Sequence, residues 1–465
     1  MKKVSILMIS GLFIIICAAV LWQWHVFSKN SDKPAGPKEE LSIIAAVKVE
    51  ENRLLVKQTF RGLDANRQYK AVIPAQLTEV NCTDAAGNPC EDGFEKLPKG
   101  KDIQFEYMIE SGPGFSLLLN DWMIVLKDAS FAKTRIEIVD HYNRKGTWAA
   151  GLPLKGFKQT ELLHYYVFEG ENSNPSLYWQ EKPLFKLSGQ KEIKYYTSHK
   201  EQAIYEFASL ARLSDKHLSV VITDGQRAVH GNGLLLAGNK LNEKELEREL
   251  ASALLASKFG TDRGKEGFTL EALTSLVIKQ EPENAKSKAM AAELENTLSA
   301  IETVDFITYF SKERQLDASS LDKYLSSIKG MNTKFFLQNS TEDQEFFPLL
   351  FTDARSVIVN GKERDELEVV VKNDEHLFPL VSTMAAIGYK TKVGTDFTIM
   401  ELSSASSKYS FNLKNKTFMI DGQSFGLLEN PFKYINGEWY LEKQWFHGIF
   451  KVEISEKSDS FILES

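Results

Sequence analysis

A change of residue pattern near position 190 constrains the fold of this chain more than any other feature of its sequence. Residues from about 43 to 185 are rich in β-branched and aromatic types, and clusters of Gly, Pro, Asn and Asp separate the strand-like runs. Residues from about 196 to 335 mix helical patterns, the first over 200–213, with short apolar strands at 218–223 and 233–237. The pattern predicts an all-β domain, an antiparallel sandwich or saddle, followed by an α+β region.

The chain has 465 residues, which implies about three domains, and its 43% hydrophobic and 26% charged residues are ordinary for a globular protein. Its formal net charge of -7 is mild, and no large basic block occurs. A nucleic-acid-binding protein needs clustered Lys and Arg to neutralise phosphates. The composition therefore argues against nucleic acid as a partner.

A largely apolar run of about nineteen residues, 4–22, directly follows Met1-Lys2-Lys3. Such a run is long enough to span a bilayer as one helix, and the positive head favours a cytoplasmic N-terminus. We therefore expect a membrane anchor over 1–27 and a flexible linker over 28–42. The protein would be single-pass at the cell membrane, with the bulk of the chain extracytoplasmic. A cleaved signal peptide, with Cys17-Ala18-Ala19 as a poor cleavage site, is the alternative.

Cys82 and Cys90 flank a loop that is rich in turn-forming residues. In an exported protein, two cysteines across such a loop predict a disulfide. A metal site would need further ligands, and no His or other Cys is close to these two in the sequence. The expectation is a Cys82–Cys90 disulfide, on the condition that this part of the chain is exported.

The segment Arg248-Glu249-Leu250-Ala251-Ser252, followed after eighteen intervening residues by Glu271, has the spacing of a zinc-peptidase site. Such a site carries H-E-x-x-H, because histidines four positions apart lie on one helical face and reach one metal. The Glu between them activates the bound water. Here Arg248 and Ser252 occupy the histidine positions, and neither is a usable zinc ligand. Glu249 keeps the acidic residue at the base position.

The same segment also has the pattern of an ordinary amphipathic helix over about 243–259. Asn242 is a suitable N-cap, Glu245 is at the third helical position and Gly260 follows the end. An apolar stripe would face the core, formed by Leu246, Leu250, Ala253 and Leu254. In this interpretation the charged residues of the helix are solvated and pair with one another.

Glu271 lies in Phe268-Thr269-Leu270-Glu271-Ala272-Leu273-Thr274-Ser275, a run similar to the W-x-x-E-G-F-T-S helix of gluzincin aminopeptidases of the glycyl-aminopeptidase-like branch. In that family, a Glu separated by eighteen residues from the second His is the third zinc ligand. The resemblance implies an all-β domain over 43–185 and a thermolysin-like helical domain over 196–335. It also implies that the loop His230-Gly231-Asn232-Gly233 would line the peptide cleft in an active relative.

Without the two histidines, the resemblance implies a degenerate site with no metal, no cofactor and no catalytic residue. Arg248 would then take the place of zinc, held by Glu271, with Glu249 as a second carboxylate. Glu249 and Glu271 could instead act as a carboxylate pair in acid/base chemistry, or could face solvent or basic neighbours.

Two runs in the last quarter of the chain carry a second resemblance: Pro379-Leu380-Val381 through Ile387-Gly388, and Ile435-Asn436-Gly437-Glu438-Trp439-Tyr440-Leu441. They look like the P-L-R-x-I-x-E-x-L-G and I-N-G-x-x-Y-V patterns of a stalk domain in exported proteins of Gram-positive bacteria, named after the N-terminal domain of copper amine oxidase. Val381 and Ala385 replace the family's Arg and Glu. The resemblance implies an α+β binding or spacer domain over 355–465, and a generic α+β domain is the alternative.

The histidines form no local metal pair, since no two stand three to five positions apart: His25, His141, His164, His199, His217, His230, His376 and His447. No G-x-S-x-G, Walker or dinucleotide-binding glycine motif occurs. The sequence therefore contains no complete local signature of a common catalytic site.

These features predict an α+β multidomain protein with an N-terminal membrane helix, a β-sandwich-like domain, a thermolysin-like helical domain and an α+β stalk-like domain. The expected function is non-catalytic binding at the cell envelope, by a pseudoenzyme with a peptidase-like domain. Its ligand would be a peptide, the cell wall or an envelope protein, and its membrane contact would be the N-terminal helix. The alternative is an exported hydrolase or peptidase with a non-standard site.

Overall fold

The computed structural model describes residues 41–464, apart from 91–92, 99, 113, 128, 188, 191, 200–204, 214–215, 260–266, 342–344, 373, 395–397, 416 and 427–428. The predicted membrane anchor and residues 28–40 of the linker lie outside the described residues. None of the helices in the described ranges combines the length and the apolar character that a membrane span requires. The chain divides into two compact units, Met1–Phe185 and Lys186–Ser465.

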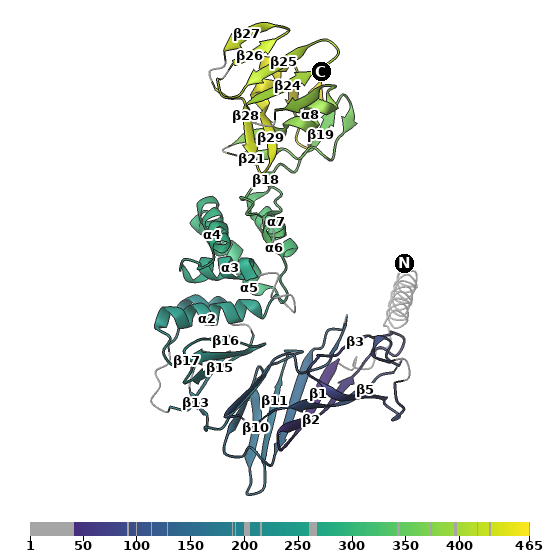
Figure 1. Cartoon of the computed structure of the whole chain (residues 1–465), viewed down its shortest axis with the longest axis vertical. Coiled ribbons are helices and arrows are strands. Elements are labelled where there is room, and N and C mark those ends of the chain that lie inside the picture. Colours follow the sequence, from purple (N-terminus) through teal and green to yellow (C-terminus); the bar gives the residue numbers. More distant parts are fainter. Residues whose placement is uncertain are drawn as a thin grey trace, which may run out of the picture. The chain divides into compact units, whose positions relative to one another are not determined.

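The first unit is built on a seven-stranded sheet in the order β10-β11-β8-β1-β2-β5-β4 (Figure 1). Alternate side chains are buried, as in β1, where Ile43, Ala45, Val47 and Val49 face the core. The strands are β1 (Ser42–Glu50), β2 (Arg53–Arg61), β4 (Thr78–Asp84), β5 (Ile103–Glu110), β8 (Lys133–Asp140), β10 (Leu154–Gln159) and β11 (His164–Gly170).

Strands β1 and β8 pair in parallel, whereas the other neighbours in this sheet pair antiparallel. The expectation of a purely antiparallel domain is therefore wrong at this pair. Parallel strands need a long crossover connection, and the chain between β1 and β8 supplies it. Residue pattern within one strand carries no information about such a distant partner.

A three-stranded antiparallel sheet in the order β6-β12-β9 shares one hydrophobic core with the large sheet. Val47 and Phe60 of the large sheet lie in this core together with Trp148 and Trp179 of the small one. The first unit is therefore sandwich-like. The remaining elements are β3 (Ala71–Val72), η1 (Gly93–Glu95), β6 (Ser116–Leu119), β7 (Val125–Leu126), β9 (Thr147–Ala150) and β12 (Leu177–Gln180).

Cys82 in β4 and Cys90 just after it form a disulfide, with their Cα atoms 5.4 Å apart. Cys82 is buried, and Cys90 packs against the same hydrophobic core. The backbone between them makes a tight loop, in which Cys90 N–H donates to Cys82 O and Asp84 N–H donates to Asn88 O. The predicted pairing of these two cysteines thus agrees with their positions in the fold.

The second unit begins with a five-stranded sheet in the order β13-β14-β15-β17-β16. Strands β14, β15 and β17 are parallel, and the short strand β16 pairs antiparallel to β17 at the edge. The predicted strands at 218–223 and 233–237 are β15 and β17. The strands are β13 (Phe185–Leu187), β14 (Ile193–Thr197), β15 (Leu218–Thr223), β16 (Val229–His230) and β17 (Leu234–Gly238).

The helix predicted over 200–213 is wrong in its described part. Residues 205–207 are not helical, and only a short 3-10 helix, η2 (Ala208–Arg212), follows them. Phe207, Leu210 and Leu213 lie in the core of the sheet and helices. Burial of these side chains therefore explains the apolar spacing that resembles a helix.

Six helices follow the sheet and complete its core (Figure 1). Capping boxes begin three of them, at Asn242, Ser299 and Asp317, and Gly330 ends one in a left-handed conformation. The helices are α2 (Glu243–Ala256), α3 (Gly267–Ile278), α4 (Ala285–Thr297), α5 (Ala300–Lys312), α6 (Ala318–Lys329) and α7 (Phe335–Asn339).

The last part of the unit has its own hydrophobic core and two similar strand–helix–hairpin segments. The first is β22 (Glu375–Pro379), α8 (Leu380–Ala386), β23 (Lys390–Val393) and β24 (Ile399–Ser403). The second is β29 (Glu438–Glu442), α9 (Lys443–Trp445) with the π-helix η3 (Phe446–Phe450), β30 (Glu453–Glu456) and β31 (Ser460–Glu464). Strands β22 and β29 pair antiparallel, which joins the two segments.

Hairpins fill the rest of this part. Asn360-Gly361, Asp421-Gly422 and Asn436-Gly437 each have positive φ at both positions, which the tight two-residue turn of a hairpin requires. The strands are β18 (Phe351–Thr352), β19 (Ser356–Val359), β20 (Lys362–Glu363), β21 (Val370–Lys372), β25 (Lys408–Asn412), β26 (Thr417–Ile420), β27 (Gln423–Gly426) and β28 (Phe432–Ile435).

Candidate functional site

Helix α2 carries three of the four residues that the zinc-peptidase spacing singles out. Asn242 and Glu245 form a reciprocal capping box, in which Glu245 N–H donates to Asn242 Oδ1 at 3.0 Å and Asn242 N–H donates to Glu245 Oε2 at 2.9 Å. The predicted apolar stripe is buried, and the helix ends at Ala256. Gly260, the predicted C-cap, lies outside the described residues. Local sequence therefore sets where this helix begins and which face it buries.

Glu249 contacts a histidine from the neighbouring sheet edge. His230 Nε2 lies 2.5 Å from Glu249 Oε2, and each side chain is 31% exposed. His230 is the last residue of β16, so the contact links α2 to the edge strand of the sheet. A carboxylate that accepts a hydrogen bond from an imidazole holds the ring orientation and the tautomer. The contact therefore fixes the His230 imidazole against α2.

Arg248 points to the connection between α3 and α4. Its Nη1 lies 2.5 Å from Glu283 Oε1, and its Nη2 donates to the carbonyl of Glu281 at 3.3 Å. The Arg248 side chain is 30% exposed and that of Glu283 is 80% exposed. The partner is therefore Glu283, whereas the sequence led us to expect Glu271 and Glu249.

The carboxylate of Glu271 accepts hydrogen bonds from the backbone where α4 begins. Its Oε1 accepts the backbone N–H of Glu283 at 2.5 Å and that of Asn284 at 3.0 Å. The first N–H groups of a helix have no partner within the helix, and its N-terminus favours negative charge. Arg248 and Glu271 thus both bind the connection between α3 and α4. Arg248 contacts the side chain of Glu283, and Glu271 accepts its backbone N–H.

Ser252 is half-buried on α2, one helical turn beyond Arg248, and its hydroxyl makes no hydrogen bond within the described residues. Glu247, next to Arg248, bridges two elements that the sequence did not indicate. Ser209 Oγ donates to Glu247 Oε1 at 2.5 Å, and Gln280 Nε2 donates to Glu247 Oε2 at 3.0 Å. Glu247, Arg248 and Glu249 therefore connect α2 to three different parts of the unit.

The residues at these positions do not fit a zinc ion. Arg248 stays protonated and is paired, and the carboxylate of Glu271 already accepts two backbone hydrogen bonds. Outside the gaps in the described chain, no three His, Cys, Asp or Glu side chains gather as a metal site would require. The side chains at these positions therefore support no chemical step through a metal.

The sequence indicated the loop that begins at His230 but not the contact between His230 and Glu249. The two residues are nineteen positions apart and belong to a strand and a helix. Their contact depends on the short strand β16 turning back along β17, with Gly233 in a left-handed conformation, φ 72°. The glycines on either side of Asn232 were the only sequence signal of that reversal.

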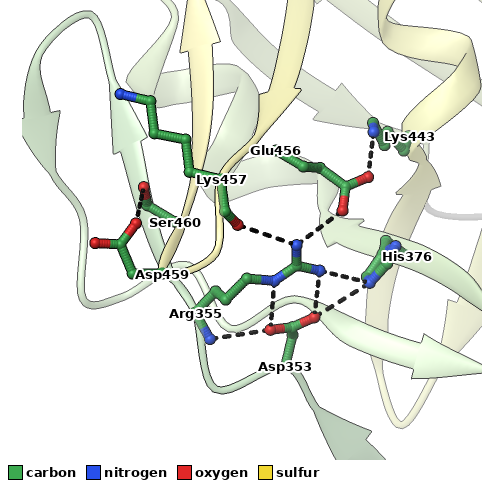
Figure 2. A network of polar contacts seen from close by, with 8 residues as sticks. All are labelled: Asp353, Arg355, His376, Lys443, Glu456, Lys457, Asp459 and Ser460. Atoms are coloured by element: carbon green, nitrogen blue, oxygen red, sulfur yellow. Dashed lines mark hydrogen bonds and ion pairs between the residues drawn. The ribbon is translucent and has the colours of Figure 1, made fainter.

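A second polar cluster lies in the last part of the chain, around Arg355 (Figure 2). Its guanidinium donates to both carboxylate oxygens of Asp353, from Nε at 2.9 Å and from Nη2 at 2.7 Å. Nη1 donates to Glu456 at 2.8 Å, and His376 Nε2 lies 3.1 Å from both Arg355 Nη2 and Asp353 Oδ2. Lys443 pairs with Glu456 from the other side.

The charges in this cluster reinforce one another. The hydrogen bond with Asp353 raises the pKa of Arg355, and the hydrogen bond from Lys443 lowers the pKa of Glu456. Burial opposes ionisation of Asp353, but its hydrogen bonds with Arg355 outweigh burial and lower its pKa. A cavity of about 380 Å³ beside His376 and Lys443 is lined largely by residues that are already paired. The cluster is therefore a structural clamp.

No protein-family model and no curated protein matches this chain. Among solved structures, the chain is similar to an M1 zinc metallopeptidase from Deinococcus radiodurans, with 11% identity over 67% of this chain and 96% of that one, at a TM-score of 0.46. It is also similar to an aminopeptidase A from Legionella pneumophila, solved with aspartic acid, with 10% identity over 83% of this chain and 56% of that one, at a TM-score of 0.48. At these identities and TM-scores the similarity does not assign the chain to a family.

Proposed function

We propose that this protein is a membrane-anchored, exported protein that binds a peptide or another envelope component through a peptidase-like region without hydrolysing it. One observation carries the proposal. The side chains at the four expected positions are either unsuited to a metal or committed to partners: Arg248 to Glu283, Glu249 to His230, and Glu271 to backbone N–H groups. Such an arrangement stabilises the fold and leaves no group free to activate water through zinc.

The same surface is suited to binding. Arg248 and the His230–Glu249 pair are each about a third exposed, so a cation and a protonatable pair face solvent from one helix and one strand edge. Peptides carry both charges at their ends and in their side chains. Charged groups that remain accessible give specificity to such encounters. A peptide is therefore the ligand that we favour over cell-wall polymer.

Binding without cleavage is testable on the full-length chain, purified in mild detergent. The chain is incubated with a random tetrapeptide mixture, and mass spectrometry identifies the peptides that co-purify with it. We expect intact peptides and a metal content well below one zinc per chain. Arg248→Glu should reduce the recovery, while Glu243→Lys, at an exposed position of the same helix, should not. One tightly held zinc per chain together with cleaved peptides would contradict the proposal.

A hydrolase with a non-standard site is the second candidate, and the His230–Glu249 contact is the observation that favours it. A carboxylate at 2.5 Å from an imidazole is able to position that imidazole as a general base. In that case Glu249→Gln would lower hydrolysis of the tetrapeptide mixture by about 100-fold or more, a usual contribution of a general base. Glu243→Gln is the matched control. Absence of hydrolysis by the unaltered protein excludes this candidate for peptide substrates.

The membrane anchor and the exported location rest on the apolar run at 4–22. Protease added to intact cells should remove the bulk of the chain and leave the N-terminal segment in the membrane fraction. Full protection from protease in intact cells, with cleavage only after lysis, would contradict export.

A further inference from the structure

A hollow of about 480 Å³ lies on the solvent-facing side of the seven-stranded sheet in the first unit, distant in sequence from the α2 site. It spans strands β8, β1, β2, β5 and β4. Its volume is within the range of ligand-binding pockets, about 300–1,000 Å³. Nothing in the packing of the sandwich core requires it, since the core is on the opposite face of the sheet.

The floor of the hollow is apolar because of the register of the strands. Leu55 of β2 faces Met108 of β5 on one side and Lys48 of β1 on the other, and Lys48 in turn faces Val139 of β8. These residues form one row across the sheet, in which the aliphatic stem of Lys48 continues the apolar strip. Ala46, the smallest outward side chain in the hollow, deepens the floor beside the row.

The lysines at the hollow are neutralised within the sheet. Lys48 Nζ lies 2.9 Å from Glu50, and Lys57 Nζ lies 3.4 Å from Glu106. Each lysine therefore already has a carboxylate partner, and neither favours an anionic ligand. The lining contains two Lys and three Glu residues, so the balance of charge at the rim is acidic.

One of these carboxylates has no partner among the described residues. Glu137 is paired with Arg135 at 2.6 Å, but Glu79 makes no ion pair or side-chain hydrogen bond within that part of the chain. Glu79 is exposed and lies at an irregularity of β4, between Thr78 and Asn81, with φ 52°. A left-handed conformation is unfavourable for a residue other than Gly, and bulges redirect side chains, frequently at functional sites.

We propose that this hollow binds a peptide segment that carries an apolar side chain next to a lysine or arginine. The apolar side chain would lie on Ala46, Leu55, Met108 and Val139. The cation would pair with Glu79, the carboxylate for which the described part of the protein supplies no partner. The acidic balance of the rim selects such a segment over an acidic one. This hollow shares no residue with the α2 site and does not depend on the function proposed there.

The test uses the full-length chain and an end-capped hexapeptide of alternating photo-leucine and lysine. Illumination should cross-link the peptide to β2 and β5, at or beside Leu55 and Met108, as located by mass spectrometry. Two matched peptides, with glutamate in place of lysine or serine in place of leucine, should cross-link about tenfold less at equal concentration, a difference of about 1.4 kcal/mol in affinity.

Two variants test the geometry. Ala46→Trp fills the floor at an exposed strand position, where an aromatic residue is tolerated, and should reduce cross-linking about tenfold. Glu79→Gln should reduce it about threefold for the lysine peptide alone, as expected of one exposed charge pair. Glu171→Gln, an exposed carboxylate of the same unit outside the hollow, should leave it unchanged.

Circular dichroism and the unfolding midpoint confirm that each variant is folded. The proposal is overturned if the glutamate peptide cross-links as well as the lysine peptide. It is also overturned if folded Ala46→Trp keeps full cross-linking, or if cross-links fall on strands outside the hollow.

Discussion

The guanidinium of Arg355 lies over the ring of Phe461, with its carbon 4.0 Å from the ring centroid. The same guanidinium holds Asp353 and Glu456 through charge-assisted hydrogen bonds. One side chain thus joins the segment before β19 to the hairpin of β30 and β31. Its planar shape is what allows it to stack and to donate at its edges at the same time.

We expect Arg355→Met to destabilise the second unit by about 2–4 kcal/mol, because Asp353, whose side chain is only 15% exposed, loses two charge-assisted hydrogen bonds and Glu456 loses one. Arg355→Lys should recover only part of this loss, since an ammonium cannot make the bidentate contact. Urea unfolding of the full-length chain measures both. Arg67→Met, which removes an exposed arginine near Tyr69, is the control and should cost well under about 1 kcal/mol.

Glu271 should matter more for stability than Arg248. Glu271→Ala leaves two N–H groups at the start of α4 without their acceptor, which should cost about 1–2 kcal/mol. Arg248→Ala removes a contact with a largely exposed Glu283 and should cost about 0.5 kcal/mol. Thermal unfolding compares the two variants. A larger effect for Arg248→Ala would instead indicate that its guanidinium balances the buried charge of a former metal site.

Thiol labelling of the folded, non-reduced protein should find neither Cys82 nor Cys90 reactive, because the two form a disulfide. Replacing both by Ser should lower stability by about 2–3 kcal/mol, the usual effect of a bridge across a short loop. Reactive thiols at both positions in protein isolated under oxidising conditions would disprove the pairing.

Asp322 should give the second unit a measurable pH dependence. Burial raises the pKa of its carboxyl to about 6, although the N–H groups of Phe336 and Leu337 donate to it. Since the folded pKa is above the unfolded value of 3.8, the protonated form favours folding. The contribution is fully present below pH 3.8 and is lost as pH rises through about 6.

The Asp322→Asn variant removes this titration and keeps one acceptor for the backbone. Urea unfolding at several pH values gives the stability difference between the original protein and the variant. We expect that difference to shift in favour of the original protein by about 2 kcal/mol as pH falls from about 7 to about 4. Parallel pH profiles for the two proteins would show that Asp322 does not titrate in this range.

Part of the α2 site followed from the sequence, because the signals are local. A capping residue, a carboxylate three positions later and an apolar stripe fix the start and the buried face of α2. The strands β15 and β17 were likewise visible as short apolar runs. The prediction of a helix over 200–213 was wrong in the described part, because the apolar spacing there reflects burial of three side chains against the sheet.

The sequence by itself thus determined the start and the buried face of α2, the strands β15 and β17, the change from strands to helices and the cysteine pair, since each depends on residues close together in the chain. Only the tertiary structure decided the partners. It paired β1 with β8 in parallel and placed Arg248 against Glu283. It also placed the Glu271 carboxylate against the backbone N–H of Glu283 and His230 against Glu249. These contacts connect residues 12 to 91 positions apart, as for Glu271 with Glu283 and Ser42 with Lys133. Which of several equally charged partners a side chain reaches depends on how whole elements pack, and spacing along one chain does not encode that.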